Sequence, residues 1–265
     1  MMNFGVKYDR IFRERGRKMI GETMEKLLSR GKDYMLSLLY PRAANCLCCK
    51  DPRRADLSDG LCSSCREELK RSAVPPEACD LCLSPIPKGK KCMMCQSPCM
   101  KYIERVYAPY CYRGPVRQLI HAFKFEACDE ALPLLADAME KSLSRRDFDC
   151  IVPVPLHKKR LRQRGVNQSL LLANALSERT GIPVREPLER LHYHGPQSLA
   201  GTARRKNVEG AFAAHDCEGM NILLLDDVRT SGNTAHACAK ALKEAGAASI
   251  SLCVSAVVYR KGKRR

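Results

Sequence analysis

The chain has 265 residues, and its 46 lysines and arginines outnumber its 29 aspartates and glutamates, which gives a formal net charge of +17. That length can hold one large domain with a smaller module, and the basic balance favours polyanionic ligands such as phosphorylated small molecules or nucleic acid. Every apolar run falls short of the roughly 20 residues that a membrane-spanning helix needs, which excludes an integral membrane protein of that type.

Residues 1–42 are the first segment, and we interpret them as a basic N-terminal extension. Apolar residues recur in it at roughly helical spacing, and Gly31 follows as a possible stop. They are Met19, Ile20, Met24, Leu27 and Leu28. We expect a solvated helix, or residues translated from an upstream start codon, rather than a membrane-surface or partner-docking helix, because the apolar face is short. The segment also lacks the apolar core of a signal peptide, so we expect a cytoplasmic protein.

Residues 43–100 form a second segment that is rich in cysteine. Ten of the 16 cysteines of the chain lie between Cys46 and Cys99. The segment has too few apolar residues to fold by burying them alone. It contains four CxxC pairs, in which a tight turn brings both sulfurs to one metal ion while a second pair completes a tetrahedron. In a cytoplasmic protein this pattern predicts a double zinc-ribbon module with two structural Zn²⁺ ions rather than disulfides.

The four pairs can share two metal ions in more than one way. Consecutive pairing is our expectation, although the spacing leaves an interleaved pairing open. It gives the ligand sets Cys46, Cys49, Cys62, Cys65 and Cys79, Cys82, Cys92, Cys95. One CxxC alone could be a redox motif, but four in so short a segment favour zinc. Cys48 could replace a neighbouring ligand, yet we expect both Cys48 and Cys99 to be spectators. Four protein thiolates leave no position for a substrate, so each site is scaffolding.

Residues 101–265 have the composition of a globular domain. Apolar runs that read as strands alternate in them with helical patterns. The predicted strands lie in RVYAPYCYRG, DCIVPVPL, NILLLDDV and SISLCVSAVVY, and the predicted helices in PVRQLIHAFKF, DEALPLLADAMEKSLSRR, NQSLLLANALSERTG and NTAHACAKALKEAG. Asn167 is the expected cap of the third helix, and Gly181 follows its end. The alternation predicts an α/β fold with a mostly parallel sheet flanked by helices.

Two adjacent acids end the third predicted strand, and a polar turn follows them. Ligands bind beyond the carboxyl ends of parallel strands, so Asp226 and Asp227 emerge at the binding edge. The turn Thr230–Thr234 offers hydroxyls and backbone amides at the positive end of a helix dipole, which suits a phosphate. The acids would repel a phosphate, so we expect them to face hydroxyls or a metal ion on the same ligand. A sugar phosphate meets both requirements, whereas capping by Thr230 or Ser231 explains only one hydroxyl.

A run of bases, Lys158–Arg164, follows the second predicted strand. Such a run is usually a solvated surface, but beyond a strand end it supplies the cations that a diphosphate needs. Our candidates for contact with a diphosphate are Arg160 and Arg164. Gly165 is our candidate for a close approach of the backbone to the ligand.

Two further groups of residues are candidates for substrate contact. The segment QSLAGTARRKNVEGAF, with its bases Arg204–Lys206, reads either as a mobile cover over the diphosphate or as an exposed loop. Tyr112, His121 and Lys124 precede the second predicted strand and are candidates for recognising an acceptor. Each of the three could instead have a purely structural role, and the sequence does not identify a general base.

The stretch LLLDDVRTSGNT resembles the phosphoribosyl-diphosphate (PRPP) binding motif of type I phosphoribosyltransferases. In that family the loop holds the 5′-phosphate and the two acids bind the ribose hydroxyls, directly or with Mg²⁺. The resemblance implies a transfer in which a nucleophile attacks C1′ while pyrophosphate leaves. By position, it implies Asp226 and Asp227 as catalytic candidates and Arg229, Thr230, Ser231, Gly232, Asn233 and Thr234 as ligand-binding candidates. To these we add Arg160 and Arg164 as catalytic candidates and Gly165 and Lys124 as ligand-binding candidates.

The order of motifs over about residues 43–260 is similar to that of the ComF family. That resemblance implies a type I phosphoribosyltransferase fold over 101–265, a double zinc ribbon over 43–100, and a role in DNA uptake for natural transformation beside a helicase-like partner. The chain departs from the pattern in CLCC, which lacks the usual glycine after the second cysteine, in FKFEAC, which is less rich in glycine, and at Ser231 and Asn233, which replace threonine and alanine.

An alternative function is a non-catalytic module that binds single-stranded DNA or a protein on a retained phosphoribosyltransferase fold. The binding surface would then consist of the four CxxC pairs, the bases at 158–164 and the tail RKGKRR. The chain has no tryptophan and only nine tyrosines and six phenylalanines, so a stacking platform for a single strand is not evident.

Overall fold

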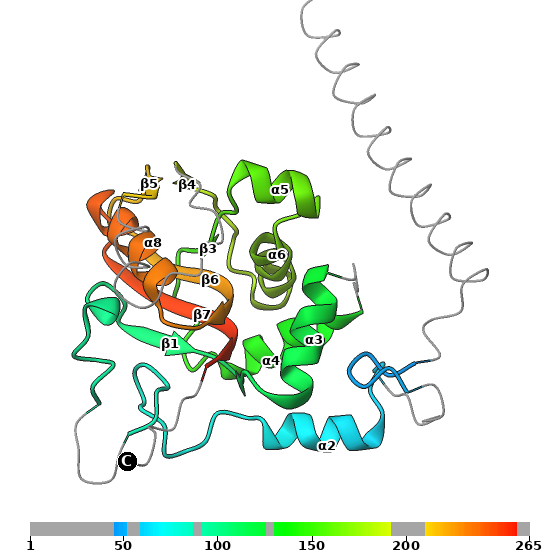
Figure 1. Ribbon diagram of the computed structural model, residues 1–265. Coiled ribbons are helices and arrows are strands. Elements are labelled where there is room, and N and C mark those ends of the chain that lie inside the picture. The colour runs from blue at the N-terminus through cyan, green and yellow to red at the C-terminus, as the bar shows by residue number, and fades with distance from the viewer. Residues whose placement is uncertain (1–44, 52–58, 87–91, 126–129, 192–209, 259–265) are drawn as a thin grey trace, which may run out of the picture. The chain divides into compact units, whose positions relative to one another are not determined.

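The computed structural model describes residues 45–51, 59–86, 92–125, 130–191 and 210–258. Contacts group the chain from Cys46 onward into one compact unit (Figure 1). The predicted N-terminal extension and the predicted cover at Arg204–Lys206 lie outside the described residues, and the boundaries at residues 42 and 100 stay predictions. In the ranges that the structure describes, no helix has the length and hydropathy to cross a membrane.

A five-stranded parallel sheet is the centre of this unit. Its strands are β1 (Arg105–Tyr107), β2 (Tyr110–Cys111), β3 (Cys150–Pro153), β6 (Asn221–Arg229) and β7 (Ser249–Val257). The order is β1-β7-β6-β3, and β2 also pairs with β7. All four pairings are parallel. The sheet therefore confirms the predicted α/β class.

Helices lie on both faces of the sheet. The described helices are α2 (Ser63–Arg71), α3 (Gly114–Phe125), α4 (Ala131–Ser142), α5 (Lys158–Arg164), α6 (Gln168–Thr180) and α8 (Asn233–Glu244), with a short 3-10 helix, η1 (Pro98–Met100). Of these, α2 packs on α3 and η1 packs on α8. Side chains of α3, α4 and α6 share a core with Leu223 and Leu225 of β6. Side chains of α8 share the other core with Ile222 and Leu224 (Figure 1). Because successive strand residues face opposite sides, β6 is apolar on both faces.

Local signals in the sequence placed the ends of α6 correctly. Asn167 is its N-cap, and its side chain accepts a hydrogen bond from the Ser169 amide at 3.2 Å. Gly181 ends the helix in the left-handed conformation, at φ 75°, which glycine adopts without steric cost.

Three elements differ from the expectation. The basic run Lys158–Arg164, to which we assigned no regular element, forms helix α5. The segment RVYAPYCYRG holds two short strands, β1 and β2, because Pro109 between them has no amide to continue the ladder. A small antiparallel pair, β4 (Leu188–Arg190) with β5 (Phe212–Ala214), was not predicted at all.

The cysteine-rich segment packs directly on the sheet and its helices. Cys46, Cys62 and Cys65 belong to the core beneath α3 and α4. Cys79 and Cys82 belong to the core beneath α8. The Val106 amide of β1 donates a 2.7 Å hydrogen bond to the Leu81 carbonyl. Folding of this segment and folding of the sheet are therefore physically linked.

Candidate functional site

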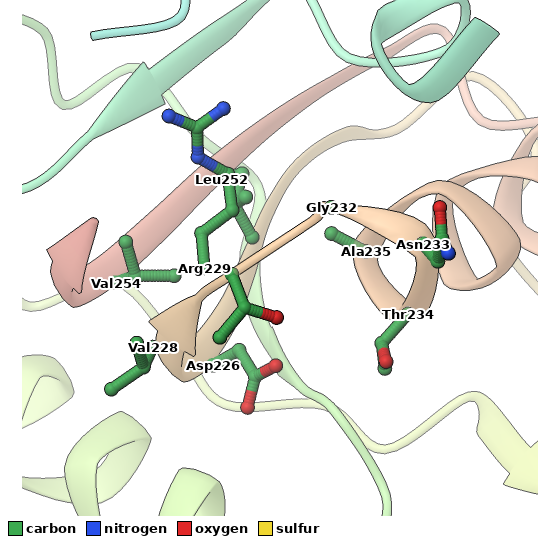
Figure 2. Close-up of a pocket in the computed structure, with 10 residues that line it drawn as sticks. Asp226, Val228, Arg229, Gly232, Asn233, Thr234, Ala235, Leu252 and Val254 are labelled. Atoms are coloured by element: carbon green, nitrogen blue, oxygen red, sulfur yellow. The ribbon is translucent and has the colours of Figure 1, made fainter. Parts of the chain in front are cut away.

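The site lies where β6 ends and turns into α8. Asp226 and Asp227 are near the carboxyl end of β6, and Gly232 precedes α8 with φ 83°, a left-handed conformation that favours glycine. Thr234 lies in the first turn of α8. Figure 2 shows Asp226 and Thr234 pointing to the same side of this turn. The expected arrangement of acids followed by a polar loop at a helix N-terminus is thus present.

A cavity of about 280 Å³ opens beside this turn and collects residues from distant parts of the chain. Its polar lining includes Tyr112, Lys124, Arg160, Ser169, Arg190, Asp226, Asp227, Thr230 and Thr234. The cavity is large enough for a phosphorylated sugar, and both acids and bases line it. The strand ends thus bring together the acidic pair, the loop threonines and one arginine of the basic run.

Hydrogen bonds and an ion pair fix the two carboxylates in the cavity. Asp226 Oδ1 accepts hydrogen bonds from Ser169 Oγ at 3.1 Å and from the Asp227 amide at 2.9 Å. Asp227 Oδ2 lies 2.5 Å from Lys124 Nζ. Burial, and after it the Asp227 carboxylate, raises the pKa of Asp226 to about 7. The Asp226 carboxyl is therefore partly protonated near neutral pH, and a bound cation would displace the proton.

Several predicted site residues lie elsewhere. Arg229 is buried and points away from Asp226 and Thr234 (Figure 2), so its side chain does not face the large cavity. Ser231 is exposed. Gly165 is exposed at φ 77°, and this backbone conformation is by itself a reason for glycine there. The side chain of Arg164 lies outside the described residues, and His121 is exposed on α3.

The sequence interpretation missed Ser169 and Arg190. Ser169 follows the cap of α6 and read as an ordinary helix residue, although it holds Asp226. Arg190 belongs to β4 and lies over the Phe212 ring, 5.3 Å from its centroid. Arg190 meets Phe212 because β4 pairs with β5, and no local sequence pattern predicts that pairing.

Two cysteine tetrads could each hold a metal ion. The sulfurs of Cys46, Cys49, Cys62 and Cys65 lie within 4.8 Å of one another, as do those of Cys79, Cys82, Cys92 and Cys95. This is the consecutive pairing that we expected. Sγ–Sγ distances are 3.8 Å for Cys49–Cys62 and 3.4 Å for Cys82–Cys92. A tetrahedral Zn²⁺ with 2.3 Å bonds to sulfur holds its sulfurs about 3.8 Å apart, so both tetrads fit zinc.

The second tetrad has thiolate character at one ligand. Burial raises the pKa of the Cys79 thiol, but hydrogen bonds from the backbone of Cys82 and Leu81 outweigh burial and lower that pKa to about 7. Amide groups that point at a sulfur stabilise its thiolate, which is the form that binds metal.

Comparison with known proteins agrees with this geometry. The family profile described as phosphoribosyl transferase domain matches residues 167–265. Competence protein ComFC of Bacillus subtilis (strain 168) is 32% identical over 205 residues, which cover 72% of this chain and 81% of that protein. Competence protein F of Haemophilus influenzae is 28% identical over 202 residues, which cover 71% and 86%. DNA utilization protein YhgH of Escherichia coli (strain K12) is 30% identical over 204 residues, which cover 72% and 87%. The chain therefore belongs to the ComF family and carries a phosphoribosyltransferase domain.

Proposed function

We propose that this protein binds PRPP together with Mg²⁺ in the cavity beside β6 and α8. The proposal rests on one observation: two carboxylates, Asp226 and Asp227, and two threonines, Thr230 and Thr234, line the same cavity. Carboxylates accept hydrogen bonds from ribose hydroxyls and are preferred ligands of Mg²⁺. Threonine hydroxyls and the amides at the start of α8 suit the 5′-phosphate.

The bases in the cavity fit the diphosphate of the same ligand. Arg160 comes from α5 and Arg190 from β4, and both line the cavity that the acids line. A guanidinium matches phosphate oxygens with paired hydrogen bonds and stays charged. Lys124 forms an ion pair with Asp227. If Mg²⁺ bound the Asp227 carboxylate, the Lys124 ammonium could turn to a phosphate instead.

The reaction that this arrangement supports is transfer of ribose 5-phosphate. The bond from C1′ to the pyrophosphate oxygen breaks with its electron pair leaving on pyrophosphate, and a bond from C1′ to the acceptor nucleophile forms. The protein contributes by orienting the ribose through its carboxylates and by offsetting charge on the leaving group through its arginines. Mg²⁺, when bound, neutralises part of that charge.

Titration of the full chain with PRPP, and separately with ribose 5-phosphate and with pyrophosphate, tests this function. In the presence of Mg²⁺, PRPP should bind more tightly than either half, because it alone reaches both the threonine turn and the arginines. Binding of pyrophosphate as tightly as PRPP would contradict a ribose site at the acids. Acceptor-dependent pyrophosphate release in a screen of nucleobases and amines would then identify the transfer.

Magnesium-dependent PRPP binding should weaken as pH falls through neutrality. Mg²⁺ binds the carboxylate of Asp226, and a pKa of about 7 leaves that group about nine-tenths ionised at pH 8 and about one-tenth ionised at pH 6. Calorimetry should therefore give about tenfold weaker binding at pH 6 than at pH 8, with proton release on binding at pH 7. Ionisation of the ligand phosphates also changes affinity, so Asp226→Asn is the control. A pH dependence as steep in that variant as in the wild type would contradict the assignment.

We also propose two structural Zn²⁺ ions, one in each cysteine tetrad, and a role in DNA uptake. Zinc is supported by the four-sulfur geometry of both tetrads. DNA uptake is supported by relatives that are named for competence and for DNA utilization. The exposed bases Lys158 and Arg162 of α5 favour a second candidate, binding of single-stranded DNA. Salt-sensitive binding of an oligonucleotide by the full chain, unaffected by PRPP, would favour that candidate over the first.

A further inference from the structure

The side chain of Arg229 leaves the site and enters the region of the second cysteine tetrad. Arg229 is the last residue of β6, is 6% exposed, and directly precedes Thr230 of the phosphate turn. In Figure 2 its guanidinium lies on the opposite side of the strand from Asp226 and Thr234. The motif suggested Arg229 for phosphate binding, whereas its guanidinium lies on the side of the strand away from Asp226 and Thr234 (Figure 2).

A hydrogen-bonded path joins this guanidinium to the metal ligands. Arg229 Nη2 donates to Ser84 Oγ at 3.4 Å, and Ser84 is itself buried. The Ser84 side chain and backbone also hydrogen-bond Cys82, and the Ser84 carbonyl accepts from the Cys79 amide at 2.9 Å. Two of the four ligands of the second tetrad are thus linked to the end of β6 through one serine.

The charge of Arg229 needs a buried partner. Among the residues that the structure describes, no acceptor reaches its Nε within hydrogen-bond distance. All four cysteines of the second tetrad act electrostatically on the guanidinium. Neutral thiols would leave a buried cation unbalanced, which is costly. One Zn²⁺ with four thiolates carries a net charge of −2 and balances it.

A second contact joins the same region to the phosphate turn. Cys99, four residues after the last ligand, donates a hydrogen bond from Sγ to Asn233 Oδ1 at 3.3 Å. A Cβ added to Gly232 would lie 3.5 Å from the Cys99 Cβ. The segment that holds the second tetrad therefore contacts the residues at both ends of the turn, Arg229 through Ser84 and Asn233 through Cys99.

We propose that Arg229 is a positioning residue that couples metal occupancy of the second tetrad to the conformation of the phosphate turn Thr230–Thr234. With zinc bound, the negative charge of the four thiolates and their metal ion attracts the guanidinium and so fixes the end of β6. Loss of the metal removes the balancing charge, so the end of β6 and the turn after it loosen. This inference rests on the proposed function for its zinc and PRPP ligands. Since coupling is reciprocal, PRPP should also tighten zinc in the second tetrad.

Zinc competition with a chromophoric chelator tests the metal half of the coupling. In the full chain, Arg229→Gln should weaken zinc at one of the two sites by about 10- to 100-fold, the usual effect of losing a group that supports a ligand. Arg229→Lys keeps the charge and should restore most of that affinity. The matched control is Arg66→Gln, because Arg66 follows Cys65 of the first tetrad and donates to the Leu61 carbonyl instead. Two zinc sites unchanged in Arg229→Gln would overturn the proposal.

Amide hydrogen exchange tests the turn without any need for PRPP. Exchange of residues 228–235 should quicken by at least about fivefold when the second zinc is removed from the wild type, and zinc should no longer protect the turn in Arg229→Gln. Ser84→Ala removes the hydroxyl that links Arg229 to Cys82 but keeps the guanidinium and all four ligand sulfurs. It should therefore quicken exchange of the turn while both zinc ions stay bound. Exchange of the turn that ignores zinc in the wild type would overturn the coupling even if Arg229→Gln fails to fold.

PRPP titration separates failure of this inference from failure of the proposed function. Wild-type protein with both sites loaded should bind PRPP at least about fivefold more tightly than protein lacking the second zinc. If fully loaded protein binds no PRPP, the proposed function fails, and hydrogen exchange still decides the coupling. If PRPP binds equally well with and without the second zinc, the function stands and the coupling fails.

Discussion

Replacing Asp226 and Asp227 together with asparagine should abolish magnesium-dependent PRPP binding, with a loss of affinity of at least about 100-fold. Each carboxylate offers charge-assisted interactions worth about 1.5–3 kcal/mol, and an amide cannot replace them toward Mg²⁺. Together they amount to about 3 kcal/mol or more, which corresponds to that loss. Calorimetry with PRPP and Mg²⁺ on the double variant and the wild type measures it.

The double variant should stay folded, which separates a lost ligand from a lost structure. The two substitutions relieve the repulsion between adjacent carboxylates but also remove the ion pair of Asp227 with Lys124. Because these effects oppose each other, the change in thermal stability at pH 8 should be small. Asp147→Asn is the matched control, because Asp147 also pairs with a base, Arg145 at 2.6 Å, but lies on the surface. Affinity for PRPP that is the same in the double variant and the control would place the ligand elsewhere.

Removing both zinc ions should unfold a large part of the protein, and this is the second large effect that we expect. Structural zinc contributes about 10–16 kcal/mol to the folding of small zinc modules, whereas a whole domain is stable by only about 5–15 kcal/mol. Cys46, Cys62 and Cys65 share a core with α3 and α4, so loss of the first ion should also destabilise the sheet. Metal analysis should find two zinc ions per chain, and thermal unfolding followed by circular dichroism should shift down sharply with a chelator.

Single cysteine variants distinguish ligands from spectators. Cys62→Ser should lower the zinc content to about one ion per chain and reduce the melting temperature. Cys48→Ser is the matched control, because Cys48 is also buried but its thiol donates a hydrogen bond to the Pro115 carbonyl, with Sγ 3.5 Å from the oxygen. It should keep two zinc ions. A chain that folds equally well with chelator present, or that loses zinc in Cys48→Ser but not in Cys62→Ser, would contradict the ligand assignment.

The fold could be predicted wherever local sequence determines local structure. The ends of α6 follow from Asn167 and Gly181, whose side chain and backbone freedom act within one helical turn. The place of Asp226 and Asp227 near the carboxyl end of a buried strand follows from the apolar run before them, although β6 continues past both acids to Arg229. The cysteine spacing predicted two four-sulfur groups, and the structure selects the consecutive pairing that the spacing had left open.

The remaining parts of the site depend on contacts between distant residues. Ser169 holds Asp226 from another element, 57 positions away, and nothing near either residue indicates this. Arg190 reaches the cavity because β4 pairs with β5. Arg229 looked like part of the phosphate loop, yet its side chain is buried toward the second tetrad. A motif fixes where a residue stands in the chain, whereas tertiary packing decides which way its side chain points.

The most direct test of the account is calorimetric titration of the full, zinc-loaded chain with PRPP at pH 8, once with Mg²⁺ and once with magnesium removed. We predict one PRPP per chain in the presence of Mg²⁺ and a large loss of affinity without it, since the acids at the end of β6 would then face the ligand uncompensated. No binding, or binding of equal strength with and without Mg²⁺, would contradict a PRPP site at Asp226 and Asp227.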